Sequence, residues 1–103
     1  MLEREIEAYL RDEVKRLGGV AYKFVSPGND GVPDRLVCLP GGEIAFVELK
    51  APGKKPTPLQ ERQIERLDLL GFTTFILDSR EAVDRFIRAA KKLLTEEVMP
   101  NDF

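Results

Sequence analysis

Two acidic side chains and a lysine flank a predicted β-turn near the middle of the chain. Asp34 precedes one apolar run of strand length, Glu48 and Lys50 follow the next, and a Pro-Gly-Gly sequence separates the runs. This pattern predicts a β-hairpin. A three-residue loop pairs Leu39 with Glu43, and the same register, which only a β-bulge would shift, places Asp34 directly opposite Glu48, with Cβ atoms roughly 4.5–5.5 Å apart. Lys50 points to the same face, because side chains alternate along a strand.

Neighbouring carboxylates repel each other, which raises their pKa values unless a cation lies between them. The simplest cation is a hard divalent metal ion, which prefers carboxylate, carbonyl and water oxygens, and the backbone carbonyl of Leu49 is available as a third ligand. Such an ion activates water and stabilises charge on a phosphoryl oxygen. Lys50 is suited to orient that water or to neutralise a phosphate. The alternative is a solvated strand end with incidental charges, and the pattern alone leaves both interpretations open.

The composition excludes several other kinds of chemistry. The chain has no histidine, which removes Cys/His zinc sites, Ser-His-Asp triads and histidine-dependent nucleases. Phosphodiester chemistry in this chain would therefore depend on carboxylates, lysine and a metal ion. The net charge of −2 argues against a protein that coats DNA phosphates generally, and it leaves binding through a local basic surface open.

Length and hydropathy indicate one globular domain. A chain of 103 residues is large enough for a single core, and 43% hydrophobic with 33% charged residues is an ordinary globular composition. No apolar run approaches the ~20 residues of a membrane span, and no secretory leader precedes the first helical pattern. The single cysteine, Cys38, lies in an apolar run, which indicates a buried thiol without a disulfide. We therefore expect a cytoplasmic, reducing location.

Hydrophobic periodicity and turn residues predict an α/β domain with the element order αβββαβα and a central mixed sheet flanked by helices. The predicted helices are 2–17, 58–70 and a last one capped by Asp78 or Ser79, and the predicted strands are 20–25, 36–39, 44–47 and 72–77. We assign residues 1–94 to this single domain and residues 95–103 to a C-terminal tail. In that tail, Val98, Met99 and Phe103 could dock on a partner subunit.

Several polar residues near the hairpin have structural explanations. Thr57 as N-cap, the proline after it and Gln60 form a capping box, which accounts for Gln60 completely. Arg35 lies on the opposite strand face from Asp34, so we expect it to have a structural pairing role. Glu3 is a first-turn acid of the kind that the helix dipole favours. Glu7 lies one helical turn beyond Glu3 on the same side.

Two loops beside the hairpin contain residues that could contact a phosphate backbone. The first loop is rich in turn residues, and its glycines would allow the backbone to approach a phosphate closely. The alternatives are a plain connector and a solvated pair of lysines. The candidate contacts are Ser26, Asn29 and Asp30 in the first loop, Lys54 and Lys55 in the second, and Lys23 in the preceding strand.

The ordered set of these residues resembles the VRR-NUC (virus-type replication–repair nuclease) family of the PD-(D/E)XK nuclease superfamily. The resemblance spans roughly residues 2–80. The residues that carry the resemblance are, in chain order, Glu3, Gly18-Gly19, Gly31-Val32-Pro33-Asp34-Arg35, Glu48-Leu49-Lys50 and Pro58-Leu59-Gln60. The resemblance implies a restriction-endonuclease-like core and, through its virus-type members, a phage or bacterial source.

The resemblance also implies a mechanism. Asp34 and Glu48, with the Leu49 carbonyl, would hold Mg²⁺ or Mn²⁺, and Glu3, with Glu7 as the alternative, would contribute the helix acid of the metal site. Lys50 would position the attacking water, and Gln60 would help to orient water or substrate.

The expected activity is that of a Mg²⁺- or Mn²⁺-dependent endodeoxyribonuclease of replication and repair. It would be structure-specific and would resolve branched DNA such as Holliday junctions. Symmetric cutting of two strands calls for a homodimer. Two alternatives stay open: a non-catalytic nucleic-acid-binding or assembly module on the same fold, and a hydrolase of another phosphodiester such as RNA. Loss of Asp34, Glu48 or Lys50 would favour the module, and all three are present.

Overall fold

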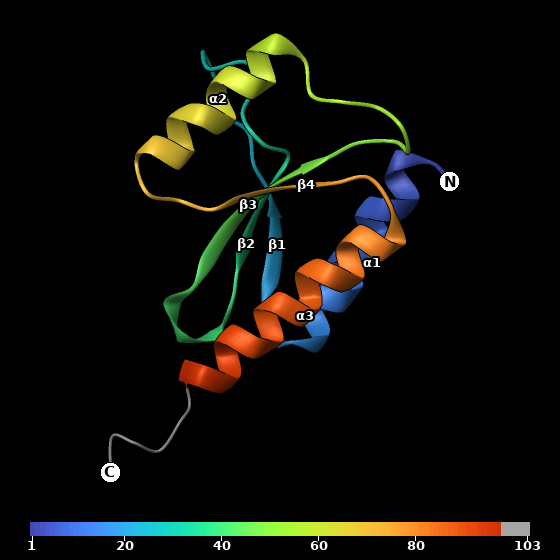
Figure 1. Cartoon of the computed structure of the whole chain (residues 1–103), viewed down its shortest axis with the longest axis vertical. Coiled ribbons are helices and arrows are strands. Elements are labelled where there is room, and N and C mark those ends of the chain that lie inside the picture. Colours follow the sequence, from blue (N-terminus) through green and yellow to red (C-terminus); the bar gives the residue numbers. More distant parts are fainter. Residues whose placement is uncertain (98–103) are drawn as a thin grey trace.

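The computed structural model describes residues 1–97 and has the element order expected from the sequence (Figure 1). The elements are α1 (Glu3–Arg16), β1 (Val20–Lys23), β2 (Arg35–Cys38), a 3₁₀ turn (Pro40–Gly42), β3 (Ile44–Leu49), α2 (Pro58–Leu69), β4 (Thr74–Leu77) and α3 (Arg80–Glu97). The four strands form one sheet in the order β1-β2-β3-β4, with β4 parallel to β3 and the other neighbours antiparallel. The predicted mixed sheet is confirmed.

The β2–β3 hairpin has the register that the sequence predicts. The Leu39 amide donates to the Glu43 carbonyl at 2.8 Å across the turn, and Arg35 pairs with Val47 at the far end. No bulge interrupts this pairing. One step further in the same register, Asp34 comes opposite Glu48.

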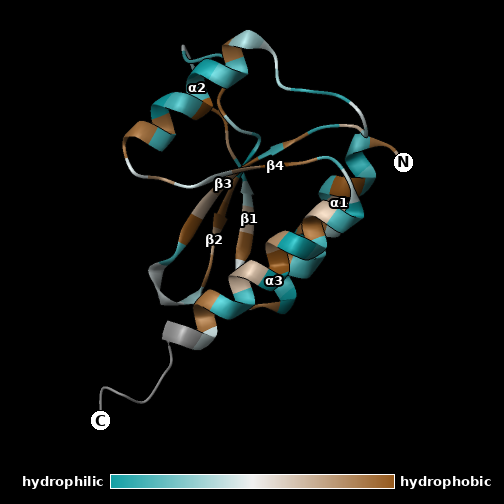
Figure 2. Ribbon diagram, viewed as in Figure 1, coloured by the Kyte–Doolittle hydropathy of each residue, from teal (hydrophilic) through white to brown (hydrophobic). Residues whose placement is uncertain are grey.

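Helices α1 and α3 cover one face of the sheet and form the core with it. The buried side chains of α1 are Ile6, Leu10 and Val14, those of α3 include Val83, Phe86 and Ile87, and the sheet contributes Val37, Val47 and Leu49. Figure 2 shows apolar and polar residues alternating along both helices, as expected of amphipathic helices. The polar sides are joined as well, because the Tyr9 hydroxyl donates to Asp84 and the Arg80 guanidinium lies over the Tyr9 ring.

Helix α2 lies apart from α1 and α3, across the sheet (Figure 1). Its start forms the predicted capping box. The backbone amide of Gln60 donates to Thr57 Oγ1 at 3.2 Å, and the backbone amide of Thr57 donates to the side-chain oxygen Oε1 of Gln60 at 2.9 Å. No residue of α2 is buried. Beside it, the rings of Phe24, Phe46 and Phe72 form a row, with neighbouring centroids 5.5 and 5.6 Å apart. This side of the sheet is therefore covered more thinly than the other.

Several element boundaries differ from the sequence prediction; strand β3, for example, extends to Leu49, beyond its predicted end at residue 47. Strand β1 ends at Lys23 rather than at residue 25, although the Phe24 amide still donates to the Asp34 carbonyl at 2.8 Å. Strand β4 begins at Thr74 rather than at residue 72.

Helix α3 continues to Glu97, so residues 95–97, assigned to the tail, are helical. The Thr95 hydroxyl donates to the Lys91 carbonyl in this last part of the helix. Residues 98–103, including Val98, Met99 and Phe103, lie outside the described residues. No helix of the described chain is long and apolar enough to cross a membrane.

Candidate active site

The two carboxylates occupy the end of the hairpin opposite to its turn. Asp34 immediately precedes β2 and is half-buried, while Glu48 is the fifth residue of β3. Asp34 Oδ2 accepts a hydrogen bond of 2.7 Å from the backbone amide of Leu49. This bond fixes the Asp34 carboxylate against the strand that carries Glu48, so the pair is held by backbone geometry.

Glu48 is a buried carboxylate without hydrogen-bond partners. It is 1% exposed, and neither of its side-chain oxygens finds a donor. Lys50 Nζ lies 3.5 Å from Glu48 Oε2, with only 14% of the Lys50 side chain exposed. Burial, followed by repulsion from Asp34, raises the pKa of Glu48 from 4.5 to about 7, although the Lys50 charge opposes the rise. The site therefore holds more acid than its own cation neutralises.

The structure distinguishes between the two candidate acids of helix α1. Glu7 Oε2 accepts hydrogen bonds from Arg35 Nε at 3.2 Å and forms an ion pair with Arg35 Nη2 at 3.0 Å. The predicted structural pairing of Arg35 thus involves Glu7. Glu3 is exposed, and its charge adds to the rise in the pKa of Glu48. Glu7 is thus held by Arg35, and Glu3 is the α1 acid whose charge acts on Glu48.

The direction of α1 supports this placement of Glu3. At one end of the helix, a Cβ added to Gly19 would lie 2.5 Å from the Cys38 carbonyl oxygen and 3.2 Å from Val14 Cγ1, so Val14 lies at the level of the end of β2. Glu7 lies at the level of Arg35, the start of β2. One further turn toward the helix N-terminus, about 5.4 Å, leads beyond the start of β2 to the end where Asp34 lies.

Helix α2 begins beside the loop that leads into Asp34. Gly31 has a φ of +87°, and a Cβ there would lie 3.0 Å from the Leu59 backbone, so only glycine allows this approach of loop and helix. Gln63 Nε2 donates to the Asp30 carbonyl at 3.3 Å. Gln60 is nearby in sequence, but its Oε1 accepts the capping bond described above, so the structural explanation for Gln60 holds.

The candidate phosphate contacts are exposed, apart from Ser26, which is partly buried. Asn29 Nδ2 donates to Ser26 Oγ at 2.9 Å, which closes the loop before Asp34 on itself. Lys54 and Lys55 are exposed in the loop that leaves β3, where the Lys54 amide donates to the Ala51 carbonyl. These residues flank the carboxylates in the chain.

The donor set fits a divalent cation. A buried carboxylate whose oxygens accept no hydrogen bond is costly, and the Lys50 ammonium, 3.5 Å from Glu48 Oε2, offsets the charge of only one of the two hairpin acids. Across the described residues, no three acidic or cysteine side chains form a ready-made metal cluster. The side chains that could hold an ion are thus two hairpin carboxylates, with backbone carbonyl and water oxygens to complete the coordination.

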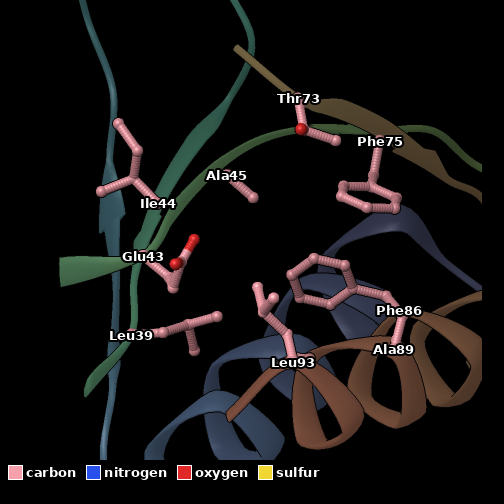
Figure 3. A pocket seen from close by; sticks show the side chains of 10 residues that line it. Leu39, Glu43, Ile44, Ala45, Thr73, Phe75, Phe86, Ala89 and Leu93 are labelled. Atoms are coloured by element: carbon pink, nitrogen blue, oxygen red, sulfur yellow. The ribbon is translucent and has the colours of Figure 1, made fainter. Parts of the chain in front are cut away.

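An apolar cavity of about 140 Å³ lies elsewhere, between α3 and the turn end of the hairpin (Figure 3). Its lining includes Leu39, Ile44, Phe86 and Leu93, with Glu43 as the one charged side chain. Glu43 lies at the opposite end of β3 from Glu48. This cavity has the character of a gap in the apolar packing and does not belong to the carboxylate site.

Some contacts around the site carry no local signal in the sequence. Tyr9 reads as part of the apolar stripe of α1, yet it bonds to a residue 75 positions away. The contact of Gln63 with Asp30 likewise joins residues 33 positions apart. The amide bond to Asp34 could have been inferred, because the predicted register brings Leu49 beside it.

A mixed four-stranded sheet flanked by helices, with an acid before one hairpin strand, an acid on the next and a lysine directly after it, defines a domain of the PD-(D/E)XK class. No model of a known protein family matches the sequence. The chain is 60% identical over 79 residues, 77% of its length and 85% of the relative's, to "Putative nuclease p44" of Acyrthosiphon pisum secondary endosymbiont phage 1. A solved structure described as a VRR_NUC domain matches with a TM-score of 0.80 and 38% identity, over 84% of this chain and 94% of that one. The chain belongs to the VRR-NUC family of the PD-(D/E)XK nuclease superfamily.

Proposed function

We propose that this protein is a Mg²⁺- or Mn²⁺-dependent endodeoxyribonuclease. The observation that carries the proposal is the buried Glu48 carboxylate, whose oxygens accept no hydrogen bond, beside Asp34 and Lys50. The name of the phage relative, a nuclease, supports the same class of reaction. Mg²⁺ and Mn²⁺ are proposed because they are the hard ions that suit carboxylate, carbonyl and water oxygens.

Each residue of the site has a proposed task. Asp34 and Glu48 hold the ion, the Leu49 carbonyl adds a backbone ligand, and Glu3 contributes directly or through a water molecule. When bound, the ion lowers the pKa of a coordinated water and offsets charge on the phosphoryl group. Lys50, held 3.5 Å from Glu48 Oε2, positions the attacking water. The cost of keeping Glu48 ionised in the absence of metal favours occupancy of the site at neutral pH.

The outer residues are proposed to hold the substrate. Lys54 and Lys55 are exposed on the loop that leaves β3, where they can contact phosphates on one side of the site. Ser26 and Asn29 belong to the loop before Asp34 and are proposed as further phosphate contacts. Gln60 lies at the start of α2, and its amide nitrogen is proposed to support the water or the substrate while its oxygen keeps the cap.

The proposed substrate is branched DNA, in replication or repair, with the Holliday junction as the first candidate. A junction has two equivalent strands to cut, and two cuts placed symmetrically need two sites related by a two-fold axis. We therefore propose a homodimer as the active form.

A cleavage panel tests this function. Labelled linear duplex, single strand, flap and four-way junction DNA are incubated with Mg²⁺, Mn²⁺ or EDTA, beside an Asp34→Asn variant that keeps the acceptor for the Leu49 amide. Metal-dependent symmetric cuts across the junction, absent in the variant, are the expected result. Cuts at flaps or single strands alone would keep the nuclease and refute junction resolution. Junction binding without any cleavage would refute the enzyme and favour a binding module.

A further inference from the structure

One buried guanidinium connects three elements next to the site. Arg35 is 8% exposed. Its Nη1 donates to the Ala21 carbonyl of β1 at 3.1 Å, and its Nε and Nη2 meet Glu7 Oε2 of α1 at 3.2 and 3.0 Å. Its own backbone belongs to β2. Helix α1 and two strands are therefore fixed to a single planar group.

The position of this group in the chain relates it to the proposed metal site. Arg35 is the residue directly after Asp34, and Glu7 lies one helical turn after Glu3. Each partner of the ion pair is therefore close in the chain to one acid of the proposed site. Arg35 adjoins Asp34 of the hairpin, and Glu7 is one turn from Glu3 of α1. Any sliding or rotation of α1 that separates Glu7 from Arg35 also moves Glu3 relative to Asp34 and Glu48.

An ion pair with a buried guanidinium and a partly buried carboxylate is a costly way to join a helix to a sheet. Apolar side chains of similar volume often stabilise a fold as well or better, because they avoid desolvating two charges. What the guanidinium provides is defined geometry, since its planar donors fix the direction of each partner. The apolar contacts of Ile6, Leu10 and Val14 secure α1 to the sheet, and the ion pair adds a fixed position along it.

We propose that the Arg35–Glu7 pair is a positioning element of the metal site, which sets the place of Glu3 relative to Asp34 and Glu48. This inference rests on the proposed metal-dependent function. Neither Arg35 nor Glu7 touches the ion in this scheme. They act through Glu3. In a protein without Glu3, substitution of Arg35 or Glu7 should therefore leave the metal affinity unchanged.

A double-mutant cycle measured by calorimetric titration of Mn²⁺, without DNA, tests the coupling. The variants are Glu7→Asp, Glu3→Gln and the two combined, on the full chain. Glu7→Asp keeps the charge and shortens the side chain, so a change in metal affinity cannot come from the loss of a distant negative charge. Glu13→Asp is the matched control, because Glu13 is an α1 acid paired with Arg16 at the surface. Thermal unfolding of each variant is recorded first.

In the presence of Glu3, Glu7→Asp is expected to weaken Mn²⁺ binding about tenfold, the lower end of what loss of a supporting residue costs at metal sites. In the Glu3→Gln background the same change should alter the Kd less than twofold, and Glu13→Asp should have no effect in either. Arg35→Lys, which keeps the charge but loses the planar donors, should reproduce the non-additive loss.

Two results would overturn the inference in distinguishable ways. Equal effects of Glu7→Asp with and without Glu3 would mean that the pair only stabilises the fold, and the metal site would stand. Mn²⁺ binding that is absent, or unaffected by Glu48→Gln, would overturn the proposed function together with this inference.

Discussion

Replacement of Glu48 by glutamine should stabilise the metal-free protein at neutral pH and leave its stability nearly unchanged in acid. The pKa of Glu48 rises from 4.5 to about 7 on folding, chiefly through burial and then through Asp34. The folded state therefore holds a proton that the unfolded chain has already released. Between pH 4.5 and 7 the unfolded state binds fewer protons than the native state, so the free energy of unfolding falls as pH rises.

The magnitude follows from the same pKa values. A pKa difference of this size lowers the free energy of unfolding by about 3 kcal/mol at a pH where Glu48 is ionised in both the folded and the unfolded state. That figure is an upper value for the gain in Glu48→Gln, since the substitution also removes the partner of Lys50, 3.5 Å away. The gain should be absent near pH 4, grow through the range from 4.5 to 7 and reach a plateau above it.

Urea unfolding followed by circular dichroism, with EDTA at several pH values, measures this gain. Subtracting the free energy of unfolding of wild type from that of the variant cancels the titration of the other carboxylates. For the control Glu65→Gln, at an exposed position on α2, this difference should not change with pH. Saturating Mg²⁺ should stabilise wild type more than Glu48→Gln at pH 8, because only wild type has both hairpin carboxylates. A variant that is less stable than wild type at pH 8 without metal would refute the reasoning.

Three further substitutions separate the tasks of neighbouring residues. Asp34→Asn should retain the thermal unfolding temperature within a few degrees, since its amide oxygen can still accept from Leu49, and should abolish cleavage of the preferred DNA; persistent cleavage would contradict its role as a ligand. Lys50→Ala should bind Mn²⁺ in calorimetric titration but lose single-turnover cleavage, and an unchanged rate would exclude Lys50 from the chemical step. Gln60→Ala should lower the free energy of unfolding by about 0.5–2 kcal/mol if its main task is the capping box; a variant of full stability without activity would instead place Gln60 in the site.

The hairpin and its register could be predicted because the information is local. Two short apolar runs and a Pro-Gly-Gly turn specify which residues face each other, and Leu39 bonds to Glu43 as expected. The capping box of α2 is another local pattern, complete within residues 57–60, and it too forms as predicted.

The choice between Glu3 and Glu7 could not be made from the sequence. Both acids lie on the same side of α1, and only the packing of that helix on the sheet decides which of them meets Arg35. The burial of Glu48 was also beyond sequence reasoning, because an acid at the end of a strand is ordinarily solvated. Its 1% exposure depends on how several elements close around it.

The thin covering of the sheet by α2 has a consequence for motion. A helix that buries none of its residues contributes little to the cooperative core, so it can open locally at a fraction of the cost of global unfolding. Its amide hydrogens should exchange with solvent well before those of α1, which has three fully buried side chains. The core of the molecule is then the hairpin, α1 and α3, of which the hairpin and α1 carry the acids. Local opening of α2 would uncover this side of the sheet while the hairpin keeps Asp34 and Glu48 in place.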